Sequence, residues 1–291
     1  MRLISYLLIL TAFATLYGCK KNVPEPDGYS SLLEFQSDSM FIDNSNPSPQ
    51  AKVLFLQEFT GVYCYTCPLA HGITDQIENL YPAQVAAMNV HSHFFSIYDD
   101  PNVMGNLYDL RTEDGDTLVS MLGGVYSVPS AAFDMTPQQN EPEIISFDRS
   151  MWLDHAADAI AKTPTVNIEM ETELNSVSRE LKIVAKYHFL QTPSTPLFYS
   201  LALVENDIID KQFVDTVVVD DYHHMHILRD MVTDAKGELL SNGAIKDEVY
   251  IKVWSYTIPL DWNEDNVELI TYVHEQEQLW DVKQTAIVAI Q

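Results

Sequence analysis

The sequence predicts an α/β domain followed by an all-β sandwich domain of immunoglobulin-like or jelly-roll type. Between Val53 and Phe95 an apolar run, a stretch with helical spacing and a second apolar run follow one another. This is the order of a βαβ unit with parallel strands. From Pro164 onward apolar and polar residues alternate, which is typical of strands with one buried face. We therefore assign residues 51–163 to the first domain and residues 164–291 to the second.

The N-terminal residues 1–18 predict an export signal. Arg2 precedes an apolar run from Leu3 to Leu16, which is shorter than the roughly 20 residues of a membrane-spanning helix. The tetrapeptide LYGC that follows resembles the bacterial lipobox, in which the cysteine is lipidated. Cys19 is therefore the predicted lipidation site, and residues 19–50, rich in Asn, Pro, Ser and Asp, form the predicted tether. The mature chain is expected to be exported and lipid-anchored in the cell envelope.

Charge and cysteine content limit the expected partners. The chain has 42 acidic and 16 basic residues and a net charge of −26. No basic patch can hold phosphate backbones, so we expect no nucleic acid partner, and we expect membrane attachment through the lipid alone. Besides Cys19, Cys64 and Cys67 are the only cysteines. No second CxxC and no HxxxH complete a four-ligand zinc site, so no metal or other cofactor is expected.

The first domain contains segments that favour strands and helices in alternation. VLFLQEF is a continuous apolar run that suits a strand buried on both faces. Pro68 opens a stretch with apolar residues at helical spacing, and proline suits a first helical turn. Between the second and third strands lies an insertion with weak helical signals. The predicted elements are a strand at 53–59, a helix at 67–81, strands at 84–95 and 125–135, and an amphipathic helix at 146–162.

The second domain is predicted to contain seven strands and no helix. Each strand is rich in β-branched and aromatic residues, and polar turns separate them. This number of strands in one antiparallel domain favours a sandwich. The predicted strands lie at 165–174, 179–189, 197–206, 213–220, 247–258, 267–275 and 285–290.

The pair Cys64 and Cys67 carries the clearest chemical signal. Unpaired amides at a helix N-terminus favour a thiolate at the first cysteine, and the second can resolve a mixed disulfide. No Lys or Arg lies between Val53 and Leu110, so only the helix N-terminus, helped by His71 or His91, would stabilise that thiolate. A reductase-like potential is therefore expected. A permanently oxidised staple is the alternative, although so short a loop restrains the unfolded chain little.

Residues around the pair resemble the thioredoxin fold. Val128–Pro129 precedes a predicted strand, as does the cis-proline that faces the cysteine pair in that fold. Glu58 matches the buried acidic proton acceptor, and Tyr63 stands in place of the usual tryptophan. The resemblance implies four catalytic residues. They are Cys64 as nucleophile, Cys67 as resolving thiol, Glu58 as proton acceptor and Pro129 as the residue that shapes the groove for a partner's extended chain.

The chain as a whole resembles the 28-kDa outer-membrane protein family of exported Gram-negative lipoproteins. The resemblance rests on EFTGVYCYTCP, VPSAAFD, HMHILRD and SYTIPLDWNEDNVELITYV. It implies a thioredoxin-like domain, a β-domain and a place in the outer membrane. Two functions remain open: thiol–disulfide exchange with protein thiols or disulfides, and a non-catalytic binding or structural role in which the β-domain contacts a protein partner. Exposure of the Cys64 sulfur should discriminate between them.

Histidines and acidic loops outside the cysteine pair favour structural roles. His91 and His93 alternate along a predicted strand and would share a face, as would His224 and His226. Two histidines are too few for a zinc site, so we interpret them as polar residues at strand ends. The acidic stretches EDGD and DWNEDN lack the spacing of a calcium loop. We expect both to be solvated turns.

Overall fold

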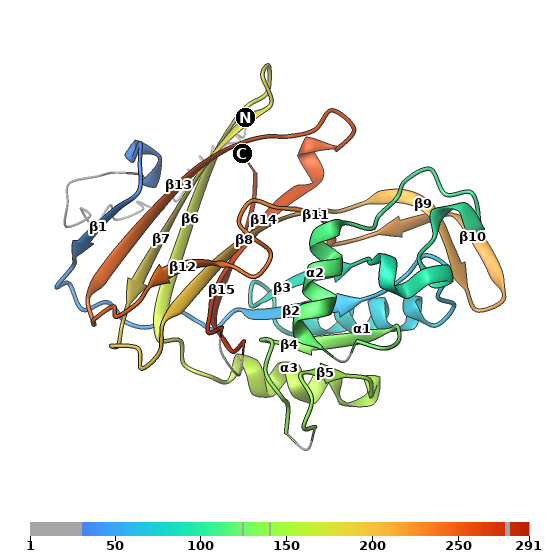
Figure 1. Cartoon of the computed structure of the whole chain (residues 1–291), viewed down its shortest axis with the longest axis horizontal. Helices are drawn as coiled ribbons and strands as arrows, with labels where there is room; N and C mark the ends of the chain where they lie inside the picture. Colours follow the sequence, from blue (N-terminus) through green and yellow to red (C-terminus); the bar gives the residue numbers. More distant parts are fainter. Residues whose placement is uncertain (1–30, 124, 140, 277–279, 291) are drawn as a thin grey trace, which may run out of the picture.

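The computed structural model describes residues 31–123, 125–139, 141–276 and 280–290 (Figure 1). It is mostly β-sheet with few helices, arranged around one long sheet and one smaller sheet. The predicted signal peptide, the lipidation site Cys19 and the first part of the tether lie outside the described residues. The second part of the predicted tether contains η1 (Leu32–Glu34) and β1 (Ser39–Ile42).

The long sheet takes strands from both predicted domains. Its order is β15-β14-β8-β11-β3-β2-β4-β5, with β12 pairing to β8. The pair β2 and β3 is parallel, which confirms the predicted βαβ unit, and β4 is antiparallel to β2. The bounds are β2 (Leu54–Phe59), β3 (Val85–Val90), β4 (Ser130–Phe133), β5 (Ile145–Ser146), β8 (Leu197–Glu205), β11 (Ile227–Met231), β12 (Glu238–Ser241), β14 (Val267–His274) and β15 (Val282–Ala289).

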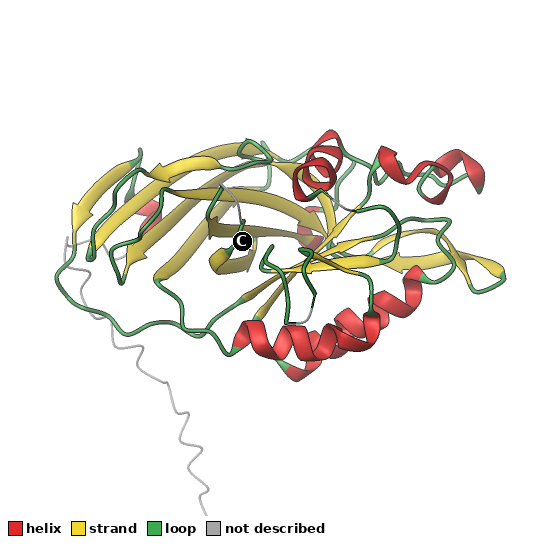
Figure 2. Cartoon of the chain, turned by 60° about the horizontal axis from the view of Figure 1, so that its bottom comes forward, coloured by secondary structure: helices red, strands yellow, loops and turns green. Residues whose placement is uncertain are grey.

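Helices cover both faces of this sheet (Figure 2). Alternate residues of β2 face opposite sides: Leu54 joins the cluster of α1 and α3, whereas Phe55 joins the cluster of α2. Both faces of the strand are therefore buried, as its continuous apolar run predicts. The helices are α1 (Cys67–Leu80), α2 (Glu113–Leu122) and α3 (Trp152–Ile160), with short 3₁₀ turns η2 (His93–Tyr98), η3 (Pro101–Val103), η4 (Arg149–Met151) and η5 (Glu264–Asn266).

The smaller sheet faces the β8–β14–β15 end of the long sheet. Its order is β1-β13-β7-β6, and all its pairs are antiparallel. Side chains of both sheets, among them Ile183 and Leu201, form one apolar cluster. Two sheets with an apolar layer between them bury one face of each, which explains the period of two in the sequence. The bounds are β6 (Val166–Asn175), β7 (Glu180–Phe189) and β13 (Glu248–Thr257).

A further cluster joins the two predicted domains. It contains residues of β2 and β3 together with residues of β8, β11 and β14. The rings of Phe55 and Tyr272 stack with centroids 4.1 Å apart. In the long sheet β11 pairs with β3 through Ile227 and Asn89. The core thus continues across the segment at Pro164, and the domain boundary placed there stays a prediction.

Several local predictions are wrong. The described residues of 164–291 contain the ten strands β6 to β15 instead of seven, because β11 and β12 lie outside every predicted strand. Residues 213–220 were expected to form one strand, but Asp215 has a positive φ of 53° and starts a tight turn. The segment therefore becomes a hairpin of β9 (Ile208–Val214) and β10 (Val217–His224). The acidic stretch EDGD, expected as a solvated turn, is the first turn of α2. Its carboxylates favour the helix N-terminus, and the Thr112 hydroxyl accepts a hydrogen bond from Gly115 N at 2.9 Å.

Candidate functional site

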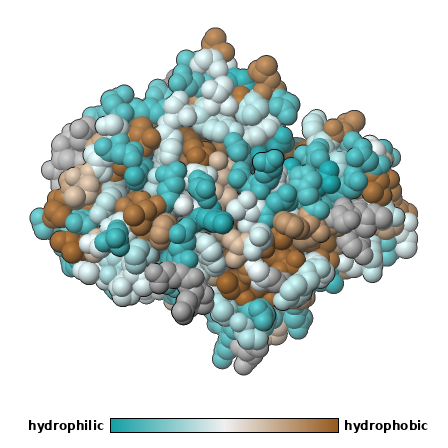
Figure 3. Space-filling view, in the orientation of Figure 1, coloured by the Kyte–Doolittle hydropathy of each residue, from teal (hydrophilic) through white to brown (hydrophobic). Residues whose placement is uncertain are grey.

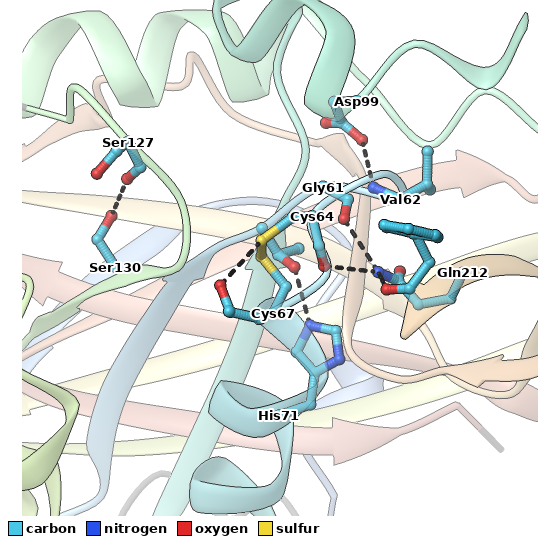
Figure 4. The surroundings of a disulfide bond; sticks show 12 residues. Gly61, Val62, Cys64, Cys67, His71, Asp99, Ser127, Ser130 and Gln212 are labelled. Carbon is cyan, nitrogen blue, oxygen red and sulfur yellow. Dashed lines mark hydrogen bonds between the residues drawn. A yellow bond between two sulfur atoms is a disulfide. The ribbon is translucent and has the colours of Figure 1, made fainter. Parts of the chain in front are cut away.

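Cys64 and Cys67 form a disulfide in the turn between β2 and α1 (Figure 4). Their Cα atoms are 5.4 Å apart. The helix begins at Cys67, as the sequence predicted, and Cys64 lies in the turn directly before it. The turn is continuous with the helix, because the Cys67 amide donates to the Cys64 carbonyl at 3.2 Å. Both sulfur atoms therefore lie at the N-terminal end of α1, where helix amides favour negative charge.

Both cysteines are buried. The exposed fraction is 3% for Cys64 and 0% for Cys67. An exchanging pair needs an exposed sulfur and a staple does not, and burial of both residues is what a staple shows. The small exposed remainder belongs to Cys64, so Cys64 is the member that a partner would reach first.

The β9–β10 hairpin covers the cysteine turn. The fully buried Gln212 donates through Nε2 to the carbonyls of Gly61 and Cys64, each at 3.2 Å. The Phe213 amide donates to the Val62 carbonyl at 2.9 Å. A hairpin far along the chain therefore fixes the backbone of the turn that holds the disulfide. The sequence did not predict this contact, because the pattern of residues 213–220 indicated a single strand instead of a hairpin.

Glu58 lies fully buried on β2. Its Oε2 accepts a hydrogen bond from the Thr74 hydroxyl at 2.7 Å, and its Oε1 lies 3.5 Å from His71 Nε2. Within the described part of the chain, Oε1 has no hydrogen-bond partner. Burial raises the pKa of Glu58 to about 8, against a smaller lowering effect of the Thr74 hydrogen bond. The carboxyl is therefore protonated at neutral pH and can take part in proton transfer.

His71 lies on α1 one turn after Cys67, and its ring points toward the disulfide (Figure 4). Its Nε2 is 2.9 Å from the Thr60 hydroxyl, and its Nδ1 is 2.6 Å from the Tyr222 hydroxyl. Burial lowers the pKa of His71 to about 3, so the imidazole is neutral. The sequence suggested His71 as a helper, but the Tyr222 partner was not foreseen.

Arg149 brings a cation to the cysteine turn. Its Nη1 donates to the Thr66 carbonyl at 3.0 Å. The expectation that only the helix N-terminus, with a histidine, would stabilise a thiolate did not include this cation. That expectation considered only the residues that adjoin the pair in sequence. The 3₁₀ turn before α3 carries Arg149 to the N-terminal end of α1.

The loop before β4 approaches the disulfide from another side. The Val128–Pro129 bond is cis, as the sequence predicted. Ser127 and Ser130, which flank this bond, hydrogen-bond at 3.0 Å and lie in the surroundings of the disulfide (Figure 4). The exposed ring of Tyr126 stacks on Phe147 at 5.4 Å. Hydrophobic surface gathers over the region of α2 and β4 (Figure 3), so apolar groups line the approach along this loop.

The remaining histidines do not form a metal site. His91 Nδ1 lies 2.5 Å from Asp99 Oδ1, whereas His93 Nδ1 lies 2.9 Å from Asp116 Oδ2. The shared face predicted for these two histidines is therefore wrong, because η2 begins at His93. His226 pairs with Glu78 at 3.3 Å. Among the described residues, no group of three or more His, Cys, Asp or Glu side chains could hold a metal ion.

Comparison with known proteins supports the family assignment. The family described as outer membrane protein Omp28 matches residues 124–291. HBP35 of Porphyromonas gingivalis has a similar structure, with a TM-score of 0.65 and 15% identity over 84% of this chain and 77% of that chain. A domain of the outer membrane lipoprotein Omp28 from Porphyromonas gingivalis matches with a TM-score of 0.31 and 20% identity, over 44% of this chain and 89% of that chain. No curated protein sequence matches.

None of the described helices is long and apolar enough to cross a membrane. The likeness to HBP35 shows a shared fold. The Omp28 match covers more than half of the chain and includes the β9–β10 hairpin and the Pro129 loop. This chain belongs to the Omp28 family of outer membrane proteins.

Proposed function

We propose that this envelope lipoprotein carries out thiol–disulfide exchange on exported proteins. The observation that carries the proposal is the buried carboxyl of Glu58, which contacts Thr74 and His71 of the helix that begins at Cys67. Burying a carboxyl whose Oε1 lacks a hydrogen bond is costly, and a purely structural disulfide does not need it. A thiol that must lose and regain a proton does need such a group.

The arrangement of elements supports a thioredoxin-like unit in residues 51–163. The parallel strands β2 and β3 are joined by α1, and β4 lies antiparallel beside β2. Helices α1 and α3 share a cluster on one face of these strands. For residues 164–291, the apolar layer between two sheets supports the sandwich interpretation.

The exchange transfers two electrons from the reduced pair to a disulfide of the partner. The Cys64 thiolate attacks one partner sulfur, forming a mixed disulfide and releasing the other sulfur as a thiolate. Cys67 then loses its proton and attacks Cys64, which releases the second partner thiol and forms the Cys64–Cys67 disulfide. A dithiol donor must reduce the pair again. The apolar loop at Pro129 would hold the partner's extended chain during these steps.

A non-catalytic role is the second candidate, and the burial of both cysteines favours it. In that case the disulfide fastens the turn on which the β9–β10 hairpin rests, and the β-domain contacts a protein partner. Under the exchange proposal the covering residues must move before a partner sulfur can meet Cys64.

Insulin reduction by the full-length mature protein, with dithiothreitol as donor, tests the proposal. The wild type should accelerate the precipitation of insulin chains, and Cys64→Ser should abolish the acceleration. Cys67→Ser should instead accumulate a mixed disulfide through Cys64, visible by mass spectrometry. Equal rates for the wild type and Cys64→Ser would refute thiol–disulfide exchange and leave the structural role.

A further inference from the structure

We propose that His71 and Tyr222 form the proton exit of the cysteine site. His71 carries the proton between buried Glu58 and solvent, and Tyr222 is a positioning residue that fixes the His71 ring. The biological setting rests on the proposed function, but the proton step itself can be measured on the isolated disulfide.

The contact between Glu58 and His71 provides the first step. Glu58 Oε1 and His71 Nε2 are 3.5 Å apart, and the Glu58 side chain is only 1% exposed. The His71 side chain is 14% exposed. A proton that leaves the carboxyl can therefore reach a group in contact with water by one short transfer. The unpaired state of Oε1 makes this oxygen available to the imidazole.

Tyr222 fixes the orientation of the imidazole. Its hydroxyl lies 2.6 Å from His71 Nδ1, while the Thr60 hydroxyl lies 2.9 Å from Nε2. With both nitrogens held, the ring cannot turn away from Glu58. A neutral imidazole has one protonated and one free nitrogen, so it can accept a proton at one side and release the other. Tyr222 is half-buried and stands at the outer end of this path.

The helix carries His71 on the same side as Cys67. Cys67 and His71 are four residues apart on α1 and share one helix face. When Cys67 attacks Cys64 in the mixed disulfide, the thiol proton passes to one oxygen of Glu58, the proton that this carboxyl already holds passes to His71, and the imidazole releases its other proton to solvent, so both groups end uncharged. The partner leaves as a thiolate and takes a proton from solvent, so protons balance over the step.

Burial keeps both relay groups uncharged at neutral pH. Burial raises the pKa of Glu58 to about 8 and lowers the pKa of His71 to about 3. A proton can therefore pass through the pair without a resting buried charge. The other groups that act on the pair are Asp75 of α1, His91 directly after β3, Arg149 of η4 and His226 between β10 and β11, while His224 of β10 is itself influenced by His71.

Part of the cysteine site lies in the second half of the chain. Tyr222 is 151 residues after His71, on the hairpin that also supplies Gln212. Movement of this hairpin would release the ring of His71 and the backbone of the turn together. The β9–β10 hairpin therefore both covers the disulfide and contributes to its proton path.

Oxidation of the reduced full-length protein by oxidised glutathione tests the relay. Stopped-flow fluorescence follows ring closure over a pH series in the wild type, His71→Gln and Tyr222→Phe. His71→Gln should slow closure near neutral pH about a hundredfold, the lower end of general acid–base effects, and Tyr222→Phe about tenfold. Tyr250→Phe is the matched control, because it also removes a hydrogen-bonded hydroxyl, but in the smaller sheet. It should close at the wild-type rate.

Wild-type closure rates and pH profiles in both folded variants would overturn the relay. If His71→Gln does not fold, Tyr222→Phe decides, since it removes a single oxygen atom. The relay and the proposed function fail separately. Slowed closure without insulin reduction would retain the relay and reject exchange on exported proteins, whereas insulin reduction with unaffected closure would do the opposite.

Discussion

Replacing Glu58 by Gln should change how stability depends on pH. The folded-state pKa of Glu58 is about 8, and the ordinary value is 4.5. At a pH between these two values, Glu58 keeps its proton in the folded chain and has lost it in the unfolded chain. The unfolded state then binds fewer protons, so wild-type stability falls as pH rises through this window. Glutamine cannot ionise, and it still offers an oxygen to the Thr74 hydroxyl.

The size of the effect follows from the width of the window. Each pH unit between the two pKa values contributes about 1.4 kcal/mol. Near neutral pH the free energy of unfolding of the wild type should therefore be roughly 3 kcal/mol lower than that of a chain in which this side chain stays protonated. Glu58→Gln should be more stable than the wild type by about this amount near pH 7 and by little near pH 4.5.

Urea unfolding followed by circular dichroism measures the prediction at pH values across the window. The exposed Glu143 provides a matched control, since Glu143→Gln removes the same charge at the surface. The free-energy difference between Glu58→Gln and the wild type should grow with pH, whereas Glu143→Gln should show no such growth. A constant difference would mean that Glu58 ionises in the folded chain as it does in water, and its role as a buried proton acceptor would be lost.

Three further changes test other parts of the site. Cys19→Ala should release the protein into the soluble fraction, because it removes the predicted lipid; membrane association of the variant in fractionated cells would contradict it. Arg149→Gln should make the pair about 10–30 mV more reducing in a glutathione buffer, because the thiolate loses a nearby cation; an unchanged potential would show that Arg149 only holds the Thr66 carbonyl. Gln212→Ala should speed reduction by dithiothreitol about fivefold or more, because two hydrogen bonds that hold the turn are lost. Gln138→Ala also removes two bonds to carbonyls and should have no such effect.

Local patterns predicted the centre of the site well. The apolar run of β2 and the helical spacing after Pro68 are short-range signals, and both elements lie where the sequence placed them. The cis bond before Pro129 was predicted from the resemblance to the thioredoxin fold. In contrast, α2 was missed, because its first turn combines three acidic residues with Gly115 and resembles a polar loop.

The outer parts of the site could not be predicted, because their contacts are distant in sequence. Gln212 meets the Cys64 carbonyl across 148 residues, and Arg149 meets the Thr66 carbonyl across 83. Alternation of apolar and polar residues indicates which face of a strand is buried. It does not indicate which distant loop the strand end will contact. Even the turn at Asp215 was hidden, because β-branched residues follow it closely.

The matched family segment and the cysteine pair occupy different parts of the chain. Cys64, Cys67, Glu58 and His71 precede residue 124, where the Omp28 match begins. The residues that hold the turn from outside, which are Arg149, Gln212 and Tyr222, all lie within the match. The covering elements thus belong to the segment that defines the family, whereas the chemistry belongs to the segment before it. Gln212 holds the cysteine turn and Tyr222 holds the His71 ring. Variants of these two residues therefore test whether the hairpin fixes a structural disulfide or controls access to an exchange site. Variants of the cysteines alone are less informative on this point.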